Sequence, residues 1–258
     1  MYPSVTKPTK RKTKIQTKVP KKRTKQTTEE DLLFKSKTAD FSTDVNLNVD
    51  VTVVMRNQQS KICEFINNWN GGFICVAMAW FTNFDILQAL VDAQKKRNVL
   101  VLVVVQKEDF LRPDHSKKSF VSWSRKLRNV YKELGVLSCQ KNRITQLLNL
   151  TANNWIVDEK EDECVRCLGN YNSKKDPCHP RMHHKFLVFG WFTVHQIPYS
   201  SCVWTGSYNF SKNSEQSYEN AVLIKSTSVS ASYLKEFITL FKLSEPLDWT
   251  SKWMITPL

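Results

Sequence analysis

The sequence lacks any long apolar segment. Its longest aliphatic run covers only residues 99–105, far short of the roughly 18 apolar residues that a membrane-spanning helix needs, so we expect no transmembrane segment. The first residues lack the apolar core of a secretory signal, so we expect an intracellular protein. The 258 residues are nevertheless 41% hydrophobic and 11% aromatic, which is enough for a sizeable buried core.

A disulfide framework is also missing. The seven cysteines are odd in number and scattered, which favours a reducing compartment over a secreted, disulfide-stapled fold. Cys164 and Cys167 have the spacing of half a zinc knuckle, and Cys178 and His179 follow. Adjacent Cys and His rarely bind one ion together, so two interpretations stay open: a structural zinc held by these residues, or free thiols packed as small apolar side chains.

Acidic residues are absent from the first 26 positions, which carry ten of the 38 basic residues. Without them, 28 basic residues face 24 acidic ones, so the tail supplies ten of the fourteen net positive charges. We expect residues 1–30 to form a disordered basic tail and residues 31–258 to form the folded domain. Such a tail can bind phosphates or act as a nuclear localisation signal, so we expect a nucleic-acid partner and a nuclear or cytoplasmic location.

The hydrophobic pattern of the domain alternates between strands and helices, which predicts an α/β fold. We read residues 138–180, which are polar and rich in Asn, Lys, Asp and Cys, as an insertion or long excursion. Asn83 or Asp85 can cap the second helix, and Asn98 ends it. Strands are expected at 45–53, 73–81, 99–105, 186–194, 201–205 and 221–224, and helices at 58–69, 83–98, 121–134, 211–218 and 229–241.

Two segments carry polar residues at the lip of an apolar strand. In the first, His183 and Lys185 are two apart and point to the same face of a strand. In the second, Ser207 and Asn209 have the same spacing, and Glu219 follows. An imidazole can attack phosphorus, a cation and an amide can hold phosphate oxygens, and a carboxylate can orient the imidazole. These residues predict a site that cleaves phosphodiesters.

The pair of segments resembles the HxK…GSxN signature of the phospholipase D superfamily, and the second half is similar to that of the Nuc-type endonucleases. The likeness covers about residues 45–242 and implies a single domain with a mixed central β-sheet flanked by helices on both faces. It implies that His183 is the nucleophile, that Lys185 and Asn209 bind phosphate, and that Ser207 supports the site. Glu219, or alternatively Glu215, would orient the histidine, and no metal is needed for catalysis. His184 fills the variable position and is expected to pack.

The sequence departs from the family pattern at one position, and it contains a single copy of the HxK motif. The family's aspartate, five residues after the lysine, is replaced by Gly190. HxK occurs once, and family members with one copy form homodimers, so we expect a two-fold dimer in which both motifs meet at one site.

Three functions fit this pattern. The first is a nuclease that hydrolyses DNA or RNA, supported by the basic tail and the Nuc-like segment. The second is a phospholipid hydrolase of the cardiolipin type, which uses the same chemistry. The third is a catalytically inactive nucleic-acid-binding or assembly protein, suggested by the lost aspartate.

Overall fold

A computed structural model of the chain describes residues 49–111, 118–134, 140–151, 163–171 and 180–247. All of them fall within one compact unit, Thr43–Leu258. The expected basic tail, with its boundary at residue 30, lies outside the described residues. None of the described helices is both long and apolar enough to cross a membrane.

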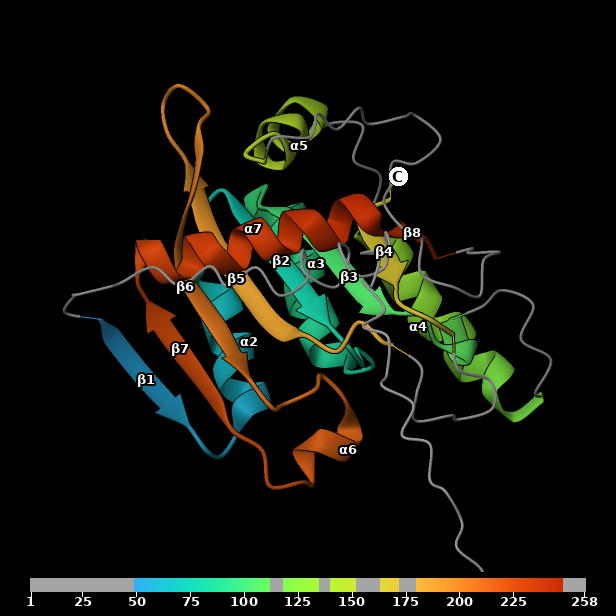
Figure 1. The fold of residues 1–258 in the computed structure, drawn as a ribbon. Helices are drawn as coiled ribbons and strands as arrows, with labels where there is room; N and C mark the ends of the chain where they lie inside the picture. The colour runs from blue at the N-terminus through green and yellow to red at the C-terminus, as the bar shows by residue number, and fades with distance from the viewer. Residues whose placement is uncertain (1–48, 112–117, 135–139, 152–162, 172–179, 248–258) are drawn as a thin grey trace, which may run out of the picture. The chain divides into compact units, whose positions relative to one another are not determined.

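The described strands form one eight-stranded sheet in the order β1-β7-β6-β5-β2-β3-β4-β8 (Figure 1). Neighbours β2, β3 and β4 run parallel, and every other pair is antiparallel, so the sheet is mixed, as expected. The strands are β1 (Asp50–Val54), β2 (Phe73–Met78), β3 (Leu100–Gln106), β4 (Val165–Leu168), β5 (Lys185–Phe192), β6 (Pro198–Gly206), β7 (Ala221–Lys225) and β8 (Glu245–Pro246).

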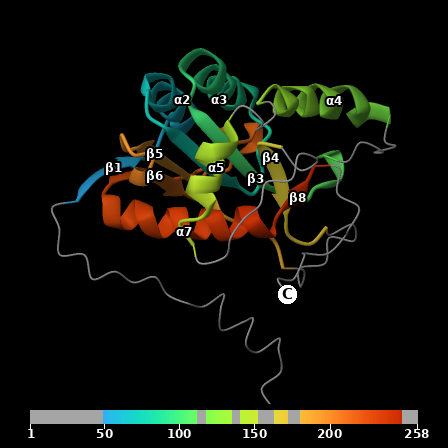
Figure 2. The same ribbon diagram turned by 90° about the horizontal axis from the view of Figure 1, so that it is seen from above.

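Helices cover both faces of this sheet, which confirms the predicted fold class. In Figure 2, α2 and α3 lie on one side of the strands and α7 on the other. The second helix begins at Asn83, whose side chain accepts hydrogen bonds from the amides of Asp85 and Ile86, and ends at Asn98. The helices are α2 (Gln58–Asn68), α3 (Phe84–Arg97), α4 (Lys118–Glu133), α5 (Lys141–Leu148), α6 (Lys212–Glu215) and α7 (Thr227–Leu243), with a 3-10 turn at Asp109–Leu111.

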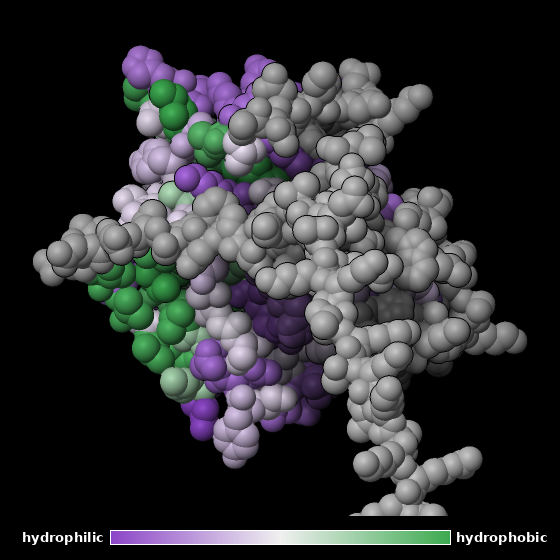
Figure 3. Space-filling model, viewed as in Figure 1, coloured by the Kyte–Doolittle hydropathy of each residue, from purple (hydrophilic) through white to green (hydrophobic). Residues whose placement is uncertain are grey.

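The centre of the sheet is apolar on both faces. Every residue of β2 and β3 is buried, because helices pack above and below these two strands. At the β1 edge the covering is incomplete, and Val51 and Val53 are 49% and 56% exposed. Figure 3 shows this region, at the left over β1 and β7, as an apolar patch. An edge strand with exposed apolar side chains favours pairing with another chain.

The segment 138–180, which we read as an insertion or long excursion, contributes to the sheet where the structure describes it. It contains α5 and also β4, which pairs with β3 inside the sheet. The strand signal was hidden because Arg166 sits in the middle of β4. Its guanidinium is buried and donates to the hydroxyl and the carbonyl of Ser244, at 2.8 and 2.6 Å.

Candidate active site

The two polar segments meet at one edge of the sheet. His183 lies just before β5 and Ser207 just after β6, and these strands pair with Phe186 opposite Thr205. The hydroxyl of Thr205 donates to the carbonyl of Lys185 at 3.2 Å. The end of β2 closes the group, since the Ala79 amide donates to the His184 carbonyl at 2.9 Å. Backbone pairing alone therefore brings residues from distant parts of the chain to one place.

The ammonium group of Lys185 lies against the ring of His183. Its Nζ is 3.3 Å from both imidazole nitrogens and donates to the His183 carbonyl at 3.0 Å. Partial burial lowers the pKa of His183, and the positive charges of Lys185 and Arg181 lower it further. The pKa of Lys185 is also lowered by burial, an effect that the charge of Glu219 opposes. The imidazole therefore stays neutral, the form that can attack phosphorus, to a lower pH than an ordinary histidine.

His184 faces away from this pair. Its Nε2 lies 3.2 Å from a carboxylate oxygen of Glu236 on α7, and its ring packs edge-on against Phe186. The side chain of His184, expected to pack, is 45% exposed and contacts α7 rather than the His183–Lys185 pair.

Ser207 is bonded to the residues that follow α6. Its amide donates to the Asn220 carbonyl at 3.0 Å, and its hydroxyl accepts from the Asn220 amide at 3.1 Å and donates to the Glu219 carboxylate. Glu219 was expected to orient His183, but within the described residues its carboxylate is bonded to Ser207. The alternative, Glu215, accepts a hydrogen bond from the Asn83 side chain.

Asn209 is buried at the base of the same loop. Its carbonyl oxygen Oδ1 has no hydrogen-bond partner among the described residues. The loop is anchored one residue later, where the Phe210 carbonyl accepts from the amides of Thr82 and Asn83 at 2.7 and 2.9 Å. A buried amide with an unused polar atom is able to take part in binding an incoming ligand.

Residues 62–241 match a family model described as "Cardiolipin synthase, PLD-like domain". The chain belongs to this PLD-like family. It is 32% identical to the uncharacterised protein L381 of Acanthamoeba polyphaga mimivirus over 235 residues, which are 85% of this chain and 74% of that protein.

Two solved structures are similar to this PLD-like chain. Nuc, a phospholipase D family member from Salmonella typhimurium, is 18% identical, with 77% of this chain and 97% of Nuc covered and a TM-score of 0.44. NucT from Helicobacter pylori is 14% identical, with 77% and 99% covered and a TM-score of 0.46.

The structure explains why the PLD-like domain carries glycine at position 190. Gly190 lies at a break in the register between β5 and β6. A Cβ atom there would overlap the Phe73 ring and lie 2.5 Å from the Tyr199 carbonyl oxygen. The space for the aspartate side chain is therefore occupied by an aromatic ring.

Three residues beside the site were missed by sequence reasoning. Trp80 packs edge-on against His183, and its indole nitrogen donates to Glu108 at 2.8 Å. Burial raises the pKa of Glu108, while the Trp80 hydrogen bond and the charge of Arg181 lower it. The sequence contains one indication of Trp80: it directly follows the apolar run that forms β2. A residue at the end of this strand can lie at the same edge of the sheet as His183.

The expected zinc ligands are described only in part. The Cys164 sulfur accepts from Gln94 of α3 at 3.4 Å, whereas the Cys167 thiol lies 3.5 and 3.3 Å from the carbonyls of Glu245 and Pro246. Burial raises the pKa of Cys167 to about 12, which disfavours the thiolate that a metal requires. In the described part of the chain no three metal-binding side chains gather. Cys178 and His179 lie outside it, so the zinc site stays a prediction.

Proposed function

We propose that this PLD-like protein is a metal-independent phosphodiesterase that hydrolyses DNA or RNA. The single observation that carries the proposal is the contact between the Lys185 ammonium and the His183 ring, at the edge where Ser207 and Asn209 lie. Burial lowers the pKa of this imidazole, and the charge of Lys185 lowers it further. A neutral imidazole beside a fixed cation is the arrangement that attack on a phosphodiester requires.

The reaction proceeds in two displacements. A ring nitrogen of His183 attacks phosphorus, forming a phosphorus–nitrogen bond and breaking the ester bond to the leaving oxygen, which takes up a proton. Water then attacks the phosphohistidine, the phosphorus–nitrogen bond breaks, and the phosphate product leaves. Lys185 and Asn209 hold the non-bridging oxygens as negative charge accumulates on them, and Ser207, bonded to Glu219, supports the loop.

A second copy of the chain completes the site. Because HxK occurs once in the sequence, the proton for the leaving oxygen comes from His183 of the other protomer across a two-fold axis. Light scattering should therefore give the mass of a dimer at micromolar concentration. A fully active monomer would contradict this part of the proposal.

The net charge of +14 favours a polyanionic substrate, and we infer that the basic residues 1–26 contribute to nucleic-acid binding in the nucleus or cytoplasm.

Two alternative functions have specific support. The name of the family, cardiolipin synthase, favours a phospholipid headgroup. The loss of the aspartate at Gly190 favours a non-catalytic nucleic-acid-binding protein.

Cleavage assays with His183→Ala and His184→Ala separate these functions. The neighbouring histidine is a matched control because it packs against α7. Labelled single- and double-stranded DNA and RNA, and cardiolipin vesicles, are incubated with each protein in the presence of EDTA. We expect wild type and His184→Ala to cut nucleic acid, and His183→Ala to lose activity by about a thousandfold or more.

Each alternative has its own outcome in this assay. Hydrolysis of cardiolipin without cleavage of nucleic acid would favour the lipid substrate. Salt-dependent binding without any turnover by wild type would favour the non-catalytic protein. Cleavage that EDTA abolishes would contradict the metal-independent mechanism.

A further inference from the structure

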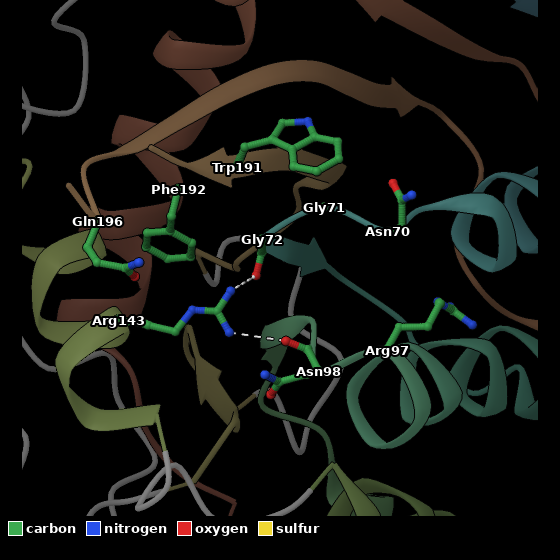
Figure 4. A pocket seen from close by; sticks show the side chains of 9 residues that line it. All are labelled: Asn70, Gly71, Gly72, Arg97, Asn98, Arg143, Trp191, Phe192 and Gln196. Atoms are coloured by element: carbon green, nitrogen blue, oxygen red, sulfur yellow. Dashed lines mark hydrogen bonds between the residues drawn. The ribbon is translucent and has the colours of Figure 1, made fainter. Parts of the chain in front are cut away.

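A cavity of about 450 Å³ lies at the end of the sheet remote from His183 (Figure 4). Strand β5 connects the two places, because it begins at Lys185 in the candidate active site and ends at Phe192 in the cavity wall. At a rise of about 3.3 Å per residue, the two ends of the strand are about 23 Å apart. The cavity is therefore separate from the candidate active site.

Among the residues that the structure describes, two arginines and no carboxylate line this cavity, so this lining is positively charged. Arg97 donates from Nε and Nη2 to the carbonyls of Trp69 and Ile66, at 3.1 and 3.0 Å. Arg143 donates from Nη1 and Nη2 to the carbonyls of Asn98 and Gly72, at 3.1 and 2.7 Å. These bonds fix both guanidinium groups, yet Nη1 of Arg97 and Nε of Arg143 have no partner in the described part of the chain. Pre-oriented arginines with unused donors are suited to binding phosphate.

Aromatic rings form another part of the wall. Trp191 packs against Trp69 with ring centroids 5.2 Å apart, and it remains partly exposed. The Arg143 guanidinium stacks over the Phe192 ring at 4.6 Å. In Figure 4 this stack lies on one side of the cavity and Arg97 lies on the other, below Asn70. A ligand that spans the cavity therefore meets aromatic surface together with two separated cations.

Side-chain amides complete the lining, and two of them sit on unusual backbone. Asn98 has φ 54° and Gln196 has φ 61°, in the left-handed region. Asn98 caps α3, a place where asparagine is common. Gln196 occupies a hairpin turn, where its backbone N–H donates to the Thr193 carbonyl at 2.8 Å. Glycine is the usual residue at such a position. A glutamine at this position places its side-chain amide at the rim of the cavity, but its left-handed backbone carries a conformational cost. Strained backbone of this kind is typical of functional sites.

We propose that this cavity binds a nucleoside phosphate, with the phosphate on the arginines, the base against the aromatic wall and the amides at the edge of the base. The volume lies within the range of small-molecule sites. The ligand is either a free nucleotide or the terminal nucleotide of a strand, since both present the same groups. The proposal does not depend on catalysis at His183.

The test is calorimetric titration of the full chain, as wild type and as His183→Ala, in the presence of EDTA. The probes are adenosine 5′-monophosphate, adenosine, inorganic phosphate and a 5′-phosphorylated oligonucleotide. We expect the nucleotide or the oligonucleotide to bind at least about tenfold more tightly than adenosine or phosphate, equally in both proteins. Binding of the oligonucleotide alone identifies the strand terminus as the source, and binding of both identifies the nucleotide unit. The proposal would be overturned if neither the nucleotide nor the oligonucleotide bound more tightly than phosphate, or if neither showed saturable binding below about 1 mM.

Two variants locate the binding. Arg97→Gln removes one cation and should weaken nucleotide binding by about tenfold while leaving adenosine binding unchanged. Gln196→Gly relaxes the turn, so it should keep or raise the melting temperature and still weaken binding. Unchanged nucleotide affinity in a folded Gln196→Gly protein, together with unchanged affinity in Arg97→Gln, would place the nucleotide elsewhere on the molecule.

Discussion

The indole of Trp80 meets the imidazole of His183 edge to face, with ring centroids 6.2 Å apart and ring planes at 86°. Trp80 is 38% exposed, and its orientation is held by the hydrogen bond from its nitrogen to Glu108. The indole shields one side of the imidazole from water. Since burial is the largest cause of the lowered pKa of His183, Trp80 helps to keep this imidazole neutral.

Replacing Trp80 by alanine should raise the pKa of His183 towards its ordinary value near 6.5, because the ring becomes better hydrated. NMR titration of the imidazole measures the shift, and the acidic limb of the pH profile of kcat/KM should move to higher pH with it. Trp80→Phe is the matched control, since it keeps an aromatic ring and loses only the bond to Glu108. An unchanged pKa in Trp80→Ala would contradict the shielding role.

Arg181 acts on the same imidazole through charge. Its positive charge disfavours the protonated form of His183, so Arg181→Gln should raise the pKa of His183 and shift the acidic limb of activity to higher pH. Arg181→Lys keeps the charge and should leave the profile unchanged. Arg181 is exposed, so the difference between the two variants should shrink as salt is added. If both variants move the limb equally, the effect is steric rather than electrostatic.

The contact between Gly190 and Phe73 leaves no space for a side chain. Gly190→Ala should lower the free energy of unfolding by about 1–3 kcal/mol through overpacking. Gly190→Asp should cost more, because it adds a buried carboxylate, and it should not increase phosphodiesterase activity. Urea unfolding measures both changes.

A compensating substitution tests the cause. Phe73→Leu, which shortens the ring that occupies the site, should recover part of the loss when combined with Gly190→Ala. A double variant whose losses simply add would show that Phe73 is not the obstacle.

A buried ion pair joins β8 to the residue after β3. The Lys107 side chain is fully buried and bonded to Glu245, whose side chain is 12% exposed. Glu245→Gln removes the carboxylate that is bonded to the buried ammonium and should cost about 3–5 kcal/mol in the free energy of unfolding. Lys107→Met removes that buried charge and should cost clearly less. Equal losses in the two variants, measured by denaturant unfolding, would contradict this account.

Much of the architecture and the members of the candidate site follow from the sequence alone. The aliphatic runs of β2 and β3, the helical spacing in α2 and the Asn83 cap depend on neighbours along the chain, so local patterns reveal them. The HxK and GSxN segments likewise place their polar residues at the ends of β5 and β6 by the two-residue period of a strand.

Other features were decided only by the tertiary structure, because they depend on contacts between residues that are distant in sequence. Strand β4 contains a buried arginine, and its place in the sheet becomes possible through Ser244, 78 residues further on. Glu219 bonds to Ser207, and Trp80 reaches His183, because the ends of β2, β5 and β6 converge at one edge. The absence of a side chain at Gly190 is explained by Phe73, whose ring fills the space that a side chain would occupy. The sequence determined which chemical groups are present in the protein. Packing and hydrogen bonding across the sheet decided which of these groups are in contact.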